Sequence, residues 1–317
     1  MSYRPAVQSI IQAIETVIVG KEDVIAKSLT ALLAGGHVLL EDVPGVGKTM
    51  LVRTFSRAID LEFKRVQFTP DMLPSDLTGI SMYNQKTKEF EYRPGPLMGN
   101  IVLADEINRT SPKTQSALLE AMAERSVTVD GEVKILPSPF FVMATQNPIE
   151  HEGTYPLPEA QLDRFLLKIK MGYPSFNEEL SLLTRFEKTE PLDALQSVVT
   201  KQEVEQMQRE VRNVHVSSAV KQYIVRLVHE SRNDPNTYLG GSPRATLALM
   251  KASQAWAYIH GRDFVLPDDV KALASSVLGH RVLLTAEARY KGRTAEQLIK
   301  GWLDEMPVPM DREVKEG

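Results

Sequence analysis

Apolar and polar positions along the first 173 residues follow two periods, one typical of strands and one typical of helices. An opening amphipathic helix places four apolar residues on one face: Val7, Ile10, Ile11 and Ile14. Strands are predicted near residues 37–41, 63–68, 101–105, 140–145 and 166–171, and helical stretches at 48–60 and 112–125. Because the two kinds of element alternate, the pattern predicts an α/β fold with a mostly parallel sheet and helices on both faces.

The pattern changes at Pro174, after which strand signals vanish and helices follow one another. Thr-Lys-Gln-Glu at 200–203 is a capping box and predicts the start of a helix. Ser-Pro at 242–243 places a cap and a first-turn proline before another. We therefore expect two domains, an α/β core over residues 1–173 and an all-helical domain over residues 174–317.

Composition narrows the class of protein. With 317 residues, 43% of them apolar, the chain can form two domains of ordinary size. A formal net charge of −4 argues against a general nucleic-acid binder, for which a basic surplus is expected. The chain has no cysteine, which excludes disulfides and thiolate metal sites. It contains no apolar stretch approaching the roughly 20 residues of a membrane span and begins without a signal-peptide pattern, so we expect a soluble cytoplasmic protein.

A glycine-rich turn between a strand and a helix is the first candidate for chemistry. It reads Glu-Asp-Val-Pro-Gly-Val-Gly-Lys-Thr over residues 41–49. Gly45 and Gly47 permit backbone conformations in which several amides point at phosphate oxygens, and the following helix adds its positive N-terminal end. The usual pattern of such a loop begins with glycine, whereas this chain has Asp42 there.

The same turn supplies side chains for a nucleoside triphosphate. Lys48 can reach the β- and γ-phosphates, and the Thr49 hydroxyl can take one coordination position on Mg²⁺. We assign nucleotide binding within this segment to Pro44, Gly45, Val46, Gly47, Lys48, Thr49 and Met50.

Two carboxylates follow a second apolar strand. Residues 101–104 are apolar and precede Asp105 and Glu106, which predicts a buried parallel strand whose tip emerges at a ligand crevice. Because side chains alternate along a strand, the two carboxylates should diverge and can divide the work. Asp105 would hold Mg²⁺, directly or through water, and Glu106 would act as general base on the attacking water. An acidic helix cap is the alternative for either carboxylate alone.

Taken together, these motifs give the chain a resemblance to the MoxR family of AAA+ ATPases over nearly its full length. Besides the glycine-rich turn, it rests on Ala-Asp-Glu-Ile-Asn-Arg at 104–109, Ala-Thr-Gln-Asn-Pro at 144–148, and residues 155–165, which end in Leu-Asp-Arg-Phe. The resemblance implies a ring-forming ATPase, usually a hexamer, with an α/β core and a helical lid, which uses ATP and Mg²⁺. It also implies chaperone-like remodelling of protein complexes, commonly with a partner that carries a von Willebrand factor A domain.

The resemblance also assigns roles to three polar residues. Asn147, after the apolar strand 140–143, matches the sensor 1 residue that positions the attacking water or contacts the γ-phosphate; a plain Asn-Pro turn is the alternative. Arg164 matches the arginine finger offered to ATP on a neighbouring subunit, the alternative being a local pair with Asp163. Arg244 matches a sensor 2 arginine that reaches from the lid to the phosphates. The helix dipole disfavours a cation at that position unless an anion completes the site, and a simply exposed arginine is the alternative.

The adenine pocket and two insertions complete the expectations. Val19 and Gly20 resemble the segment that lines the adenine pocket, although Gly20 is equally explained as a helix terminator. Residues 126–136 alternate around Asp-Gly and predict a hairpin, and residues 79–99 contain a second, less regular candidate. The two insertions resemble elements that can project toward the pore of a ring, and a packed structural hairpin is the alternative. Their mixed charges favour a protein substrate over a nucleic-acid backbone.

Three other functions share the same ATP site. A magnesium-chelatase-like motor subunit would use the same core, but the motifs match MoxR better. A nucleic-acid translocase is disfavoured by the charges of the insertions and of the whole chain. A nucleotide-gated scaffold that hardly hydrolyses ATP is disfavoured by the intact Glu106 and Arg164.

Overall fold

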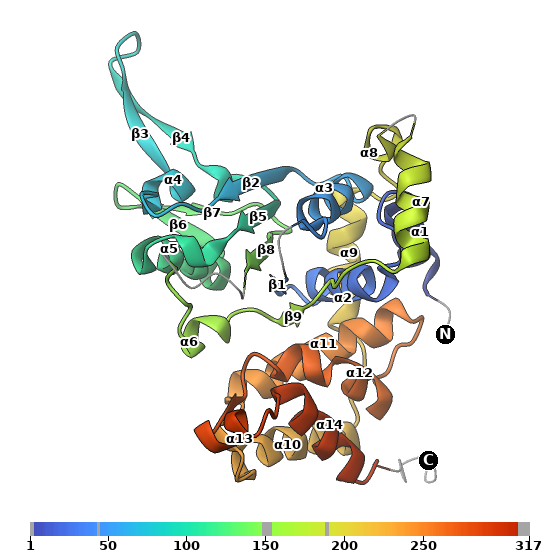
Figure 1. Ribbon diagram of the computed structural model, residues 1–317. Coiled ribbons are helices and arrows are strands. Elements are labelled where there is room, and N and C mark those ends of the chain that lie inside the picture. The colour runs from blue at the N-terminus through green and yellow to red at the C-terminus, as the bar shows by residue number, and fades with distance from the viewer. Residues whose placement is uncertain (1–2, 43–44, 148–153, 188–189, 310–317) are drawn as a thin grey trace.

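A five-stranded parallel sheet forms the centre of the core in the computed structural model, which describes residues 3–42, 45–147, 154–187 and 190–309 (Figure 1). The strand order is β2–β5–β8–β1–β9, with all neighbouring pairs parallel. The strands are β1 (Val38–Glu41), β2 (Phe63–Gln67), β5 (Ile101–Asp105), β8 (Phe141–Gln146) and β9 (Leu167–Ile169). They overlap the five predicted segments, so the predicted parallel sheet is confirmed.

Helices cover both faces of the sheet, as predicted. Alternate strand residues separate the core into two clusters: Ile101 and Leu103 pack with α1, α2 and α3, whereas Val102 and Ala104 pack with α5. These four helices are α1 (Pro5–Glu15), α2 (Glu22–Leu33), α3 (Lys48–Ala58) and α5 (Pro112–Glu124). Short helical segments are α4 (Pro74–Thr78), η1 (Pro96–Met98), η2 (Ile107–Arg109) and α6 (Glu159–Leu162).

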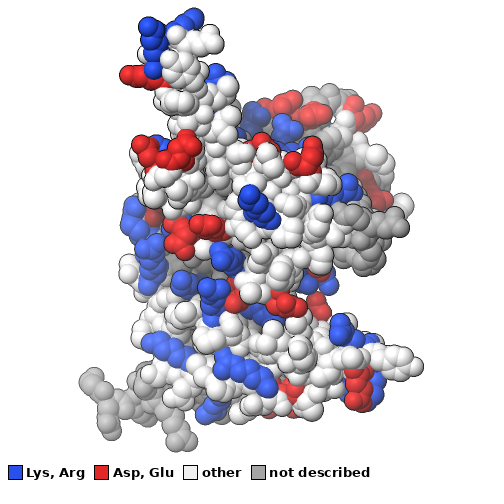
Figure 2. All heavy atoms as spheres, turned by 90° about the vertical axis from the view of Figure 1, so that its left-hand side faces the viewer, with Lys and Arg blue, Asp and Glu red and all other residues white. Residues whose placement is uncertain are grey.

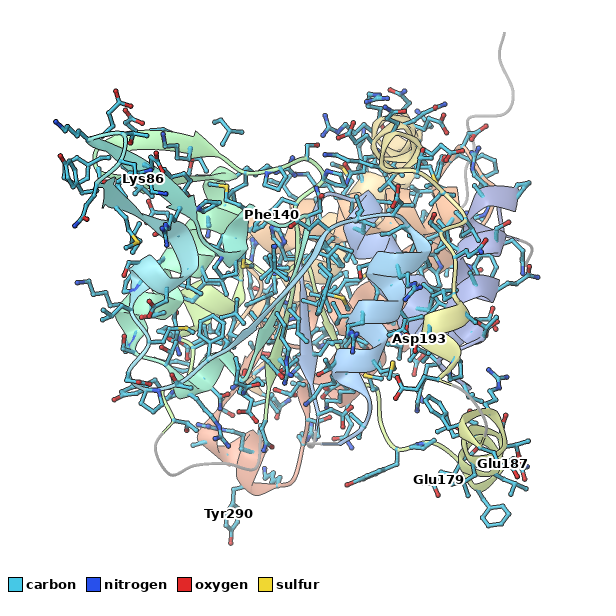
Figure 3. The ribbon with its side chains drawn as sticks, turned by 90° about the horizontal axis from the view of Figure 1, so that it is seen from above. Lys86, Phe140, Glu179, Glu187, Asp193 and Tyr290 are labelled. Atoms are coloured by element: carbon cyan, nitrogen blue, oxygen red, sulfur yellow. The ribbon has the colours of Figure 1, made fainter. Side chains whose placement is uncertain are left out.

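Both predicted hairpins are present. One joins β3 (Gly79–Asn84) to β4 (Glu89–Pro94), and the other joins β6 (Ser126–Val129) to β7 (Glu132–Ile135) around Asp130 and Gly131, which both have positive φ. The β3–β4 hairpin projects from the core (Figure 1), and acidic and basic side chains are interspersed over this side of the molecule (Figure 2). Seen from above, Lys86 of this hairpin and Glu179 of α7 (Phe176–Phe186) stand at opposite corners (Figure 3).

Further helices after α7 are α8 (Pro191–Ala194), α9 (Lys201–Val211), α10 (Ser218–Asn233), α11 (Pro243–Ile259), α12 (Pro267–Leu278), α13 (Ala286–Tyr290) and α14 (Ala295–Glu305). In Figure 1, α10 to α14 form a second region below the core, whereas α8 lies beside α7 and α9 packs against α2. The predicted caps are present, because the Thr200 and Ser242 hydroxyls both accept backbone N–H groups of the helices that follow them.

Two details qualify the prediction of an all-helical second domain. β10 (Thr237–Leu239) and β11 (Leu283–Leu284) form a short antiparallel pair, which the sequence analysis did not predict because two or three residues are too few to display a period. A continuous apolar cluster also includes Leu29 of α2 and Leu249 of α11. The division between residues 173 and 174 stays a prediction. Within the described ranges, none of the helices has both the length and the apolar character required to span a bilayer.

Candidate active site

A cavity of about 440 Å³ lies at the carboxyl ends of β1, β5 and β8. It is lined by residues from the glycine-rich turn, the first turns of α3, strand β2 and the ends of β5 and β8: Gly45, Gly47, Lys48, Thr49, Met50, Arg53, Arg65, Asp105, Glu106 and Asn147. The parallel strands therefore bring the two sequence motifs together, as expected for ligands that bind at the carboxyl edge of such a sheet. Pro44, also predicted to bind nucleotide, lies outside the described residues.

The glycine-rich turn has a backbone that favours glycine. Gly45 has φ +85° and Gly47 has φ +89°, a left-handed conformation that residues with a Cβ rarely adopt. Apart from the glycine itself and its two chain neighbours, no heavy atom of the described chain lies within 4 Å of the position that a Cβ would take at either glycine, so the space in front of the turn is open. Gly47 is also the N-cap of α3, so the positive N-terminal end of this helix lies at the cavity, where it favours an anion.

Lys48 is held in the cavity by the start of the same turn. Its Nζ donates to the Asp42 carbonyl oxygen, 2.7 Å away. Burial lowers the pKa of Lys48, and the carboxylates of Asp42, Asp105 and Glu106 oppose that shift. The Asp42 carboxylate accepts a hydrogen bond from the backbone N of Gly172, 2.7 Å from Oδ2. Asp42, which replaces the usual glycine, thus ties the turn to the segment that leads from β9 to α7.

The two carboxylates have separate partners, in line with their expected divergence. Asp105 Oδ1 accepts from the Thr145 hydroxyl and Oδ2 from Arg65 Nη2, each at 2.7 Å. Glu106 has φ 58°, an uncommon value for a residue other than glycine, and its backbone N donates to Thr145 Oγ1 at 2.8 Å. One buried hydroxyl therefore holds both acidic residues at the tip of β5.

Two side chains of β2 also contact the carboxylates, and sequence reasoning missed them. These are Arg65, the partner of Asp105, and Gln67, whose Nε2 donates to Glu106 Oε2 at 2.8 Å. Arg109 of η2 lies beside the same Glu106 oxygen, 3.0 Å from its Nε. Gln67 and Arg65 are two residues apart on a strand, so they lie on one face, beside β5. Two polar residues with this spacing at the end of a predicted strand were the available signal.

The donor set suits a magnesium nucleotide. Thr49 and Asp105 present hydroxyl and carboxylate oxygens, which Mg²⁺ prefers, to the cavity that also contains Lys48. Asn147 directly follows β8, is 5% exposed and lines the same cavity. Its amide therefore lies where a group that orients a phosphate or a water would be needed.

A second, mostly apolar cavity of about 360 Å³ adjoins the first, since Gly47 and Met50 line both. The described residues around it are Val17, Ile18, Val19, Lys21, Val46, Gly47, Met50, Met171, Pro174, Leu182, Leu183 and Phe186. Val19, which the sequence analysis assigned to an adenine pocket, and Val46 of the glycine-rich turn both line this cavity. Gly20 is absent from this described lining; it precedes α2 with φ +68°, and a Cβ there would collide with Glu178.

The two predicted arginines lie at the opposite edge of the sheet. The backbone N of Leu166 donates to the carbonyl of His37 at 2.8 Å, which places the residues before β9 beside the start of β1. Arg164 is exposed there, and its Nη1 donates to the Leu119 carbonyl at 2.7 Å. Among the described residues that line the 440 Å³ cavity, neither Arg164 nor Arg244 is found.

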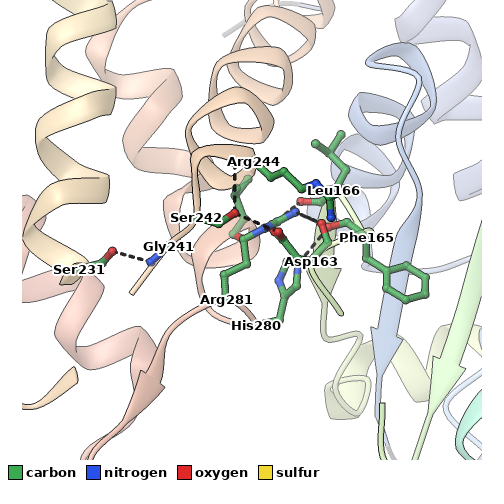
Figure 4. Close-up of polar contacts among 10 residues, drawn as sticks. Asp163, Phe165, Leu166, Ser231, Gly241, Ser242, Arg244, His280 and Arg281 are labelled. Carbon is green, nitrogen blue, oxygen red and sulfur yellow. Dashed lines mark hydrogen bonds and ion pairs between the residues drawn. The ribbon is translucent and has the colours of Figure 1, made fainter. Parts of the chain in front are cut away.

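The alternative of a local pair between Asp163 and Arg164 does not match the contacts. Asp163 instead forms an ion pair with Arg281, 2.7 Å from Nε to Oδ1, and accepts from the Ser242 hydroxyl at 3.0 Å (Figure 4). Ser242 caps α11 by accepting from the backbone N of Arg244 at 3.1 Å. The exposed Arg244, in the first turn of α11, therefore lies beside this network, and its role as a sensor 2 arginine stays a prediction.

Known proteins show the same two-part pattern. Residues 37–167 match the ATPase family associated with various cellular activities (AAA), and residues 229–301 match the AAA lid domain. The uncharacterized protein YeaC of Bacillus subtilis is 59% identical over 97% of this chain and 96% of its own. Chaperone MoxR1 of Mycobacterium tuberculosis is 44% identical over 93% of this chain and 80% of its own. A crystal structure of a candidate ATPase from Cytophaga hutchinsonii superposes with a TM-score of 0.91 at 40% identity, covering 97% of this chain and 96% of the other.

Proposed function

The chain belongs to the MoxR family of AAA+ ATPases, and on that premise we propose that it hydrolyses ATP at sites shared between adjoining copies in order to remodel protein complexes. One observation carries the proposal. Lys48, Thr49, Asp105 and Glu106 meet around one cavity, whereas Arg164 lies across the sheet from it. In this arrangement the triphosphate occupies the 440 Å³ cavity and the base occupies the apolar cavity beside it.

Each residue of the cavity has a distinct task in the proposed reaction. Lys48 and the amides of the turn offset the charge of the β- and γ-phosphates. Glu106 accepts a proton from the attacking water, and Asn147 orients that water or the γ-phosphate. Thr49 and Asp105 would hold Mg²⁺, which when bound offsets further phosphate charge. Asp105 would then exchange its contact with Arg65 for the metal or for a metal-bound water.

We propose that Arg164 completes the site of a neighbouring copy in a hexameric ring. A guanidinium placed at the transferred phosphoryl group raises the rate by about 10³- to 10⁵-fold, or roughly 4 to 7 kcal/mol of barrier. Arg164 is exposed near the start of β1, whereas its own phosphate turn follows the other end of that strand, so we propose that the ATP it approaches belongs to another copy. Arg244 lies at the same edge and is proposed to act across the same contact.

The proposed client is a protein, and the proposed partner carries a von Willebrand factor A domain, as the family resemblance implies. The β3–β4 hairpin exposes 53% of Tyr83 and 75% of Phe90, and β7 exposes Val133 and Ile135. Exposed apolar side chains on projecting strands suit contact with polypeptide. We place this activity in the cytoplasm.

Two experiments test the shared site. ATPase rate per subunit should rise with protein concentration as rings assemble, and sedimentation should report the assembly. Mixing equal amounts of Arg164→Ala and Lys48→Ala, each inactive alone, should recover activity, since about one quarter of randomly formed contacts pair an intact turn with an intact arginine. Failure to recover activity in particles verified to contain both variants would contradict the proposal.

A further inference from the structure

Arg281 is a buried arginine that follows α12 and reaches the segment that bears Arg164 (Figure 4). Its side chain is 3% exposed, and that of its partner Asp163 is 14% exposed. A guanidinium has five N–H groups, and here each one has an acceptor: Asp163 Oδ1 and the carbonyl oxygens of Asp163, Phe165, Leu166 and Val277. Four of these five acceptors belong to residues 163–166.

The arrangement of these contacts singles out Arg164. Arg281 Nη2 donates to the carbonyl of Asp163 at 3.1 Å and to the carbonyl of Phe165 at 2.6 Å. These are the carbonyls of the residues immediately before and after Arg164. One planar group therefore holds the peptide unit that precedes Arg164 and the one that follows Phe165, while the exposed Arg164 side chain donates to the Leu119 carbonyl.

Two further contacts hold the same segment. His280 Nε2 lies 3.0 Å from the carbonyl oxygen of Phe165, and the Phe165 ring is fully buried in the core. Burial lowers the pKa of His280 well below its ordinary value, so the neutral ring makes this contact as a donor. The segment is thus held between the core and the end of α12, leaving Arg164 little freedom of backbone direction.

The second oxygen of Asp163 extends the network to the lid. Asp163 Oδ2 accepts from Ser242, the N-cap of α11, and α11 carries Arg244 in its first turn. A buried ion pair is weak evidence for stability, because apolar residues of similar volume often stabilise a core as well or better. The contacts of Arg281 are instead directional and reach peptide groups near the exposed Arg164, which indicates that Arg281 positions this segment.

We propose that Arg281 is a positioning residue, which acts through Asp163 and the flanking carbonyls to aim Arg164 and to tie its direction to α11. The inference rests on the proposed function, in which Arg164 serves the ATP of a neighbouring copy. It goes beyond that function because a buried residue of the lid, which does not contact nucleotide, sets the geometry of Arg164.

The test variant is Arg281→Lys, which keeps a cation for Asp163 but lacks the planar fork that spans both carbonyls. kcat should fall about 10- to 100-fold, since small displacements of a transition-state group have effects of that size. The dissociation constant for ATP and the ring size should stay unchanged, because the nucleotide cavity of each copy is untouched. Asp163→Asn serves as a second variant and should give a smaller loss of kcat with the same unchanged affinity.

Arg262→Lys is the matched control. Arg262 makes a two-point ion pair with Asp269 in the same lid, with N···O distances of 2.6 and 2.5 Å, and this pair lies apart from residues 163–166. Arg262→Lys should lower the melting temperature about as much as Arg281→Lys does, but it should not lower kcat. A merely structural role for Arg281 would instead give equal changes in both variants.

Mixed rings separate the possible outcomes. Arg281→Lys mixed with Lys48→Ala should recover activity, because the Lys48-deficient copy offers a correctly aimed Arg164 to the intact cavity next to it. A wild-type kcat in Arg281→Lys, or no recovery of activity in verified mixed particles, would overturn the positioning role. The proposed function would still stand in that case, provided that Arg164→Ala is inactive. If Arg164→Ala also keeps full turnover, both the shared site and the positioning role are refuted.

Discussion

Thr145 donates a hydrogen bond to Asp105, with 2.7 Å between Oγ1 and Oδ1, while the same hydroxyl accepts the backbone N–H of Glu106. Thr145 lies on β8 and the two acidic residues lie at the end of β5, so the contact crosses two neighbouring strands. A single side chain thereby sets the position of the proposed metal ligand and of the proposed general base.

Removing that hydroxyl should impair both stability and turnover. Thr145→Val keeps the shape of the side chain but leaves two buried polar groups without this partner, which should cost about 1 to 3 kcal/mol of unfolding free energy. kcat should fall about 10- to 100-fold through misplacement of Glu106. Chemical denaturation and steady-state kinetics measure the two effects. Thr30→Val, which removes a buried hydroxyl bonded to the Ala26 carbonyl in α2, should leave kcat unchanged.

Binding and hydrolysis should separate at Glu106 and Lys48. Glu106→Gln should retain ATP affinity and lower kcat by about 10²- to 10⁴-fold, because the amide cannot accept the proton. Lys48→Ala should weaken ATP binding by roughly 10- to 100-fold, since a charged contact with the phosphates is lost. Calorimetric titration and a phosphate-release assay distinguish the two. Normal turnover in Glu106→Gln would refute its assignment as general base.

Stability should decrease at mildly acid pH because of His37. Burial lowers the pKa of His37 from 6.5 to about 4, the bond with the Met122 carbonyl opposes this shift, and Arg125 reinforces it. The unfolded chain therefore binds more protons than the folded chain between these values, so stability is complete above pH 6.5 and is lost as pH falls toward 4. The full loss from this residue is about 3 kcal/mol.

Denaturant titrations between pH 7.5 and 4.5 measure this dependence. His37→Gln can still accept from Val142 and donate to Met122, and it should show a shallower decline than the wild type. The remaining decline reflects other groups, among them buried His280, whose pKa is also lowered by burial. An identical slope in both proteins would contradict the role of His37.

Polynucleotides should fail to stimulate the ATPase. Lys86 and Lys88 of the β3–β4 hairpin stand among Glu89 and Glu91, and the formal net charge of the chain is −4. A translocase that grips a phosphate backbone would show stimulation that weakens steeply with salt. Assays with single- and double-stranded polymer at low and moderate salt decide the question. Salt-sensitive stimulation would restore the nucleic-acid translocase as the better interpretation.

Local sequence predicted the five strands of the sheet, helices α1, α3 and α5, both hairpins and the glycine-rich turn, whereas α2 was not predicted. The turn over residues 45–49 could be predicted because its glycines, lysine and threonine lie close together in one loop. Asp105 and Glu106 could be read because an apolar strand that ends in two carboxylates is local as well. The short β10–β11 pair has no such local pattern in the sequence.

Contacts between elements could not be read in this way. Arg65 and Gln67 reach the acidic residues because β2 lies next to β5 in the sheet, and that order is decided by the packing of the whole core. Arg281 meets residues 163–166 because α12 packs beside β9. The spacing of these residues along the chain does not predict either contact.

The amino-acid sequence alone determined which segments form strands and helices and which loop can cradle phosphate, because backbone preference and the period of apolar residues act over a few neighbouring positions. Tertiary structure alone decided that Arg164 and Arg244 lie at the edge of the sheet opposite to the cavity. The physical reason is that strand order and helix docking are fixed by burial of the apolar faces together, a property of the whole chain.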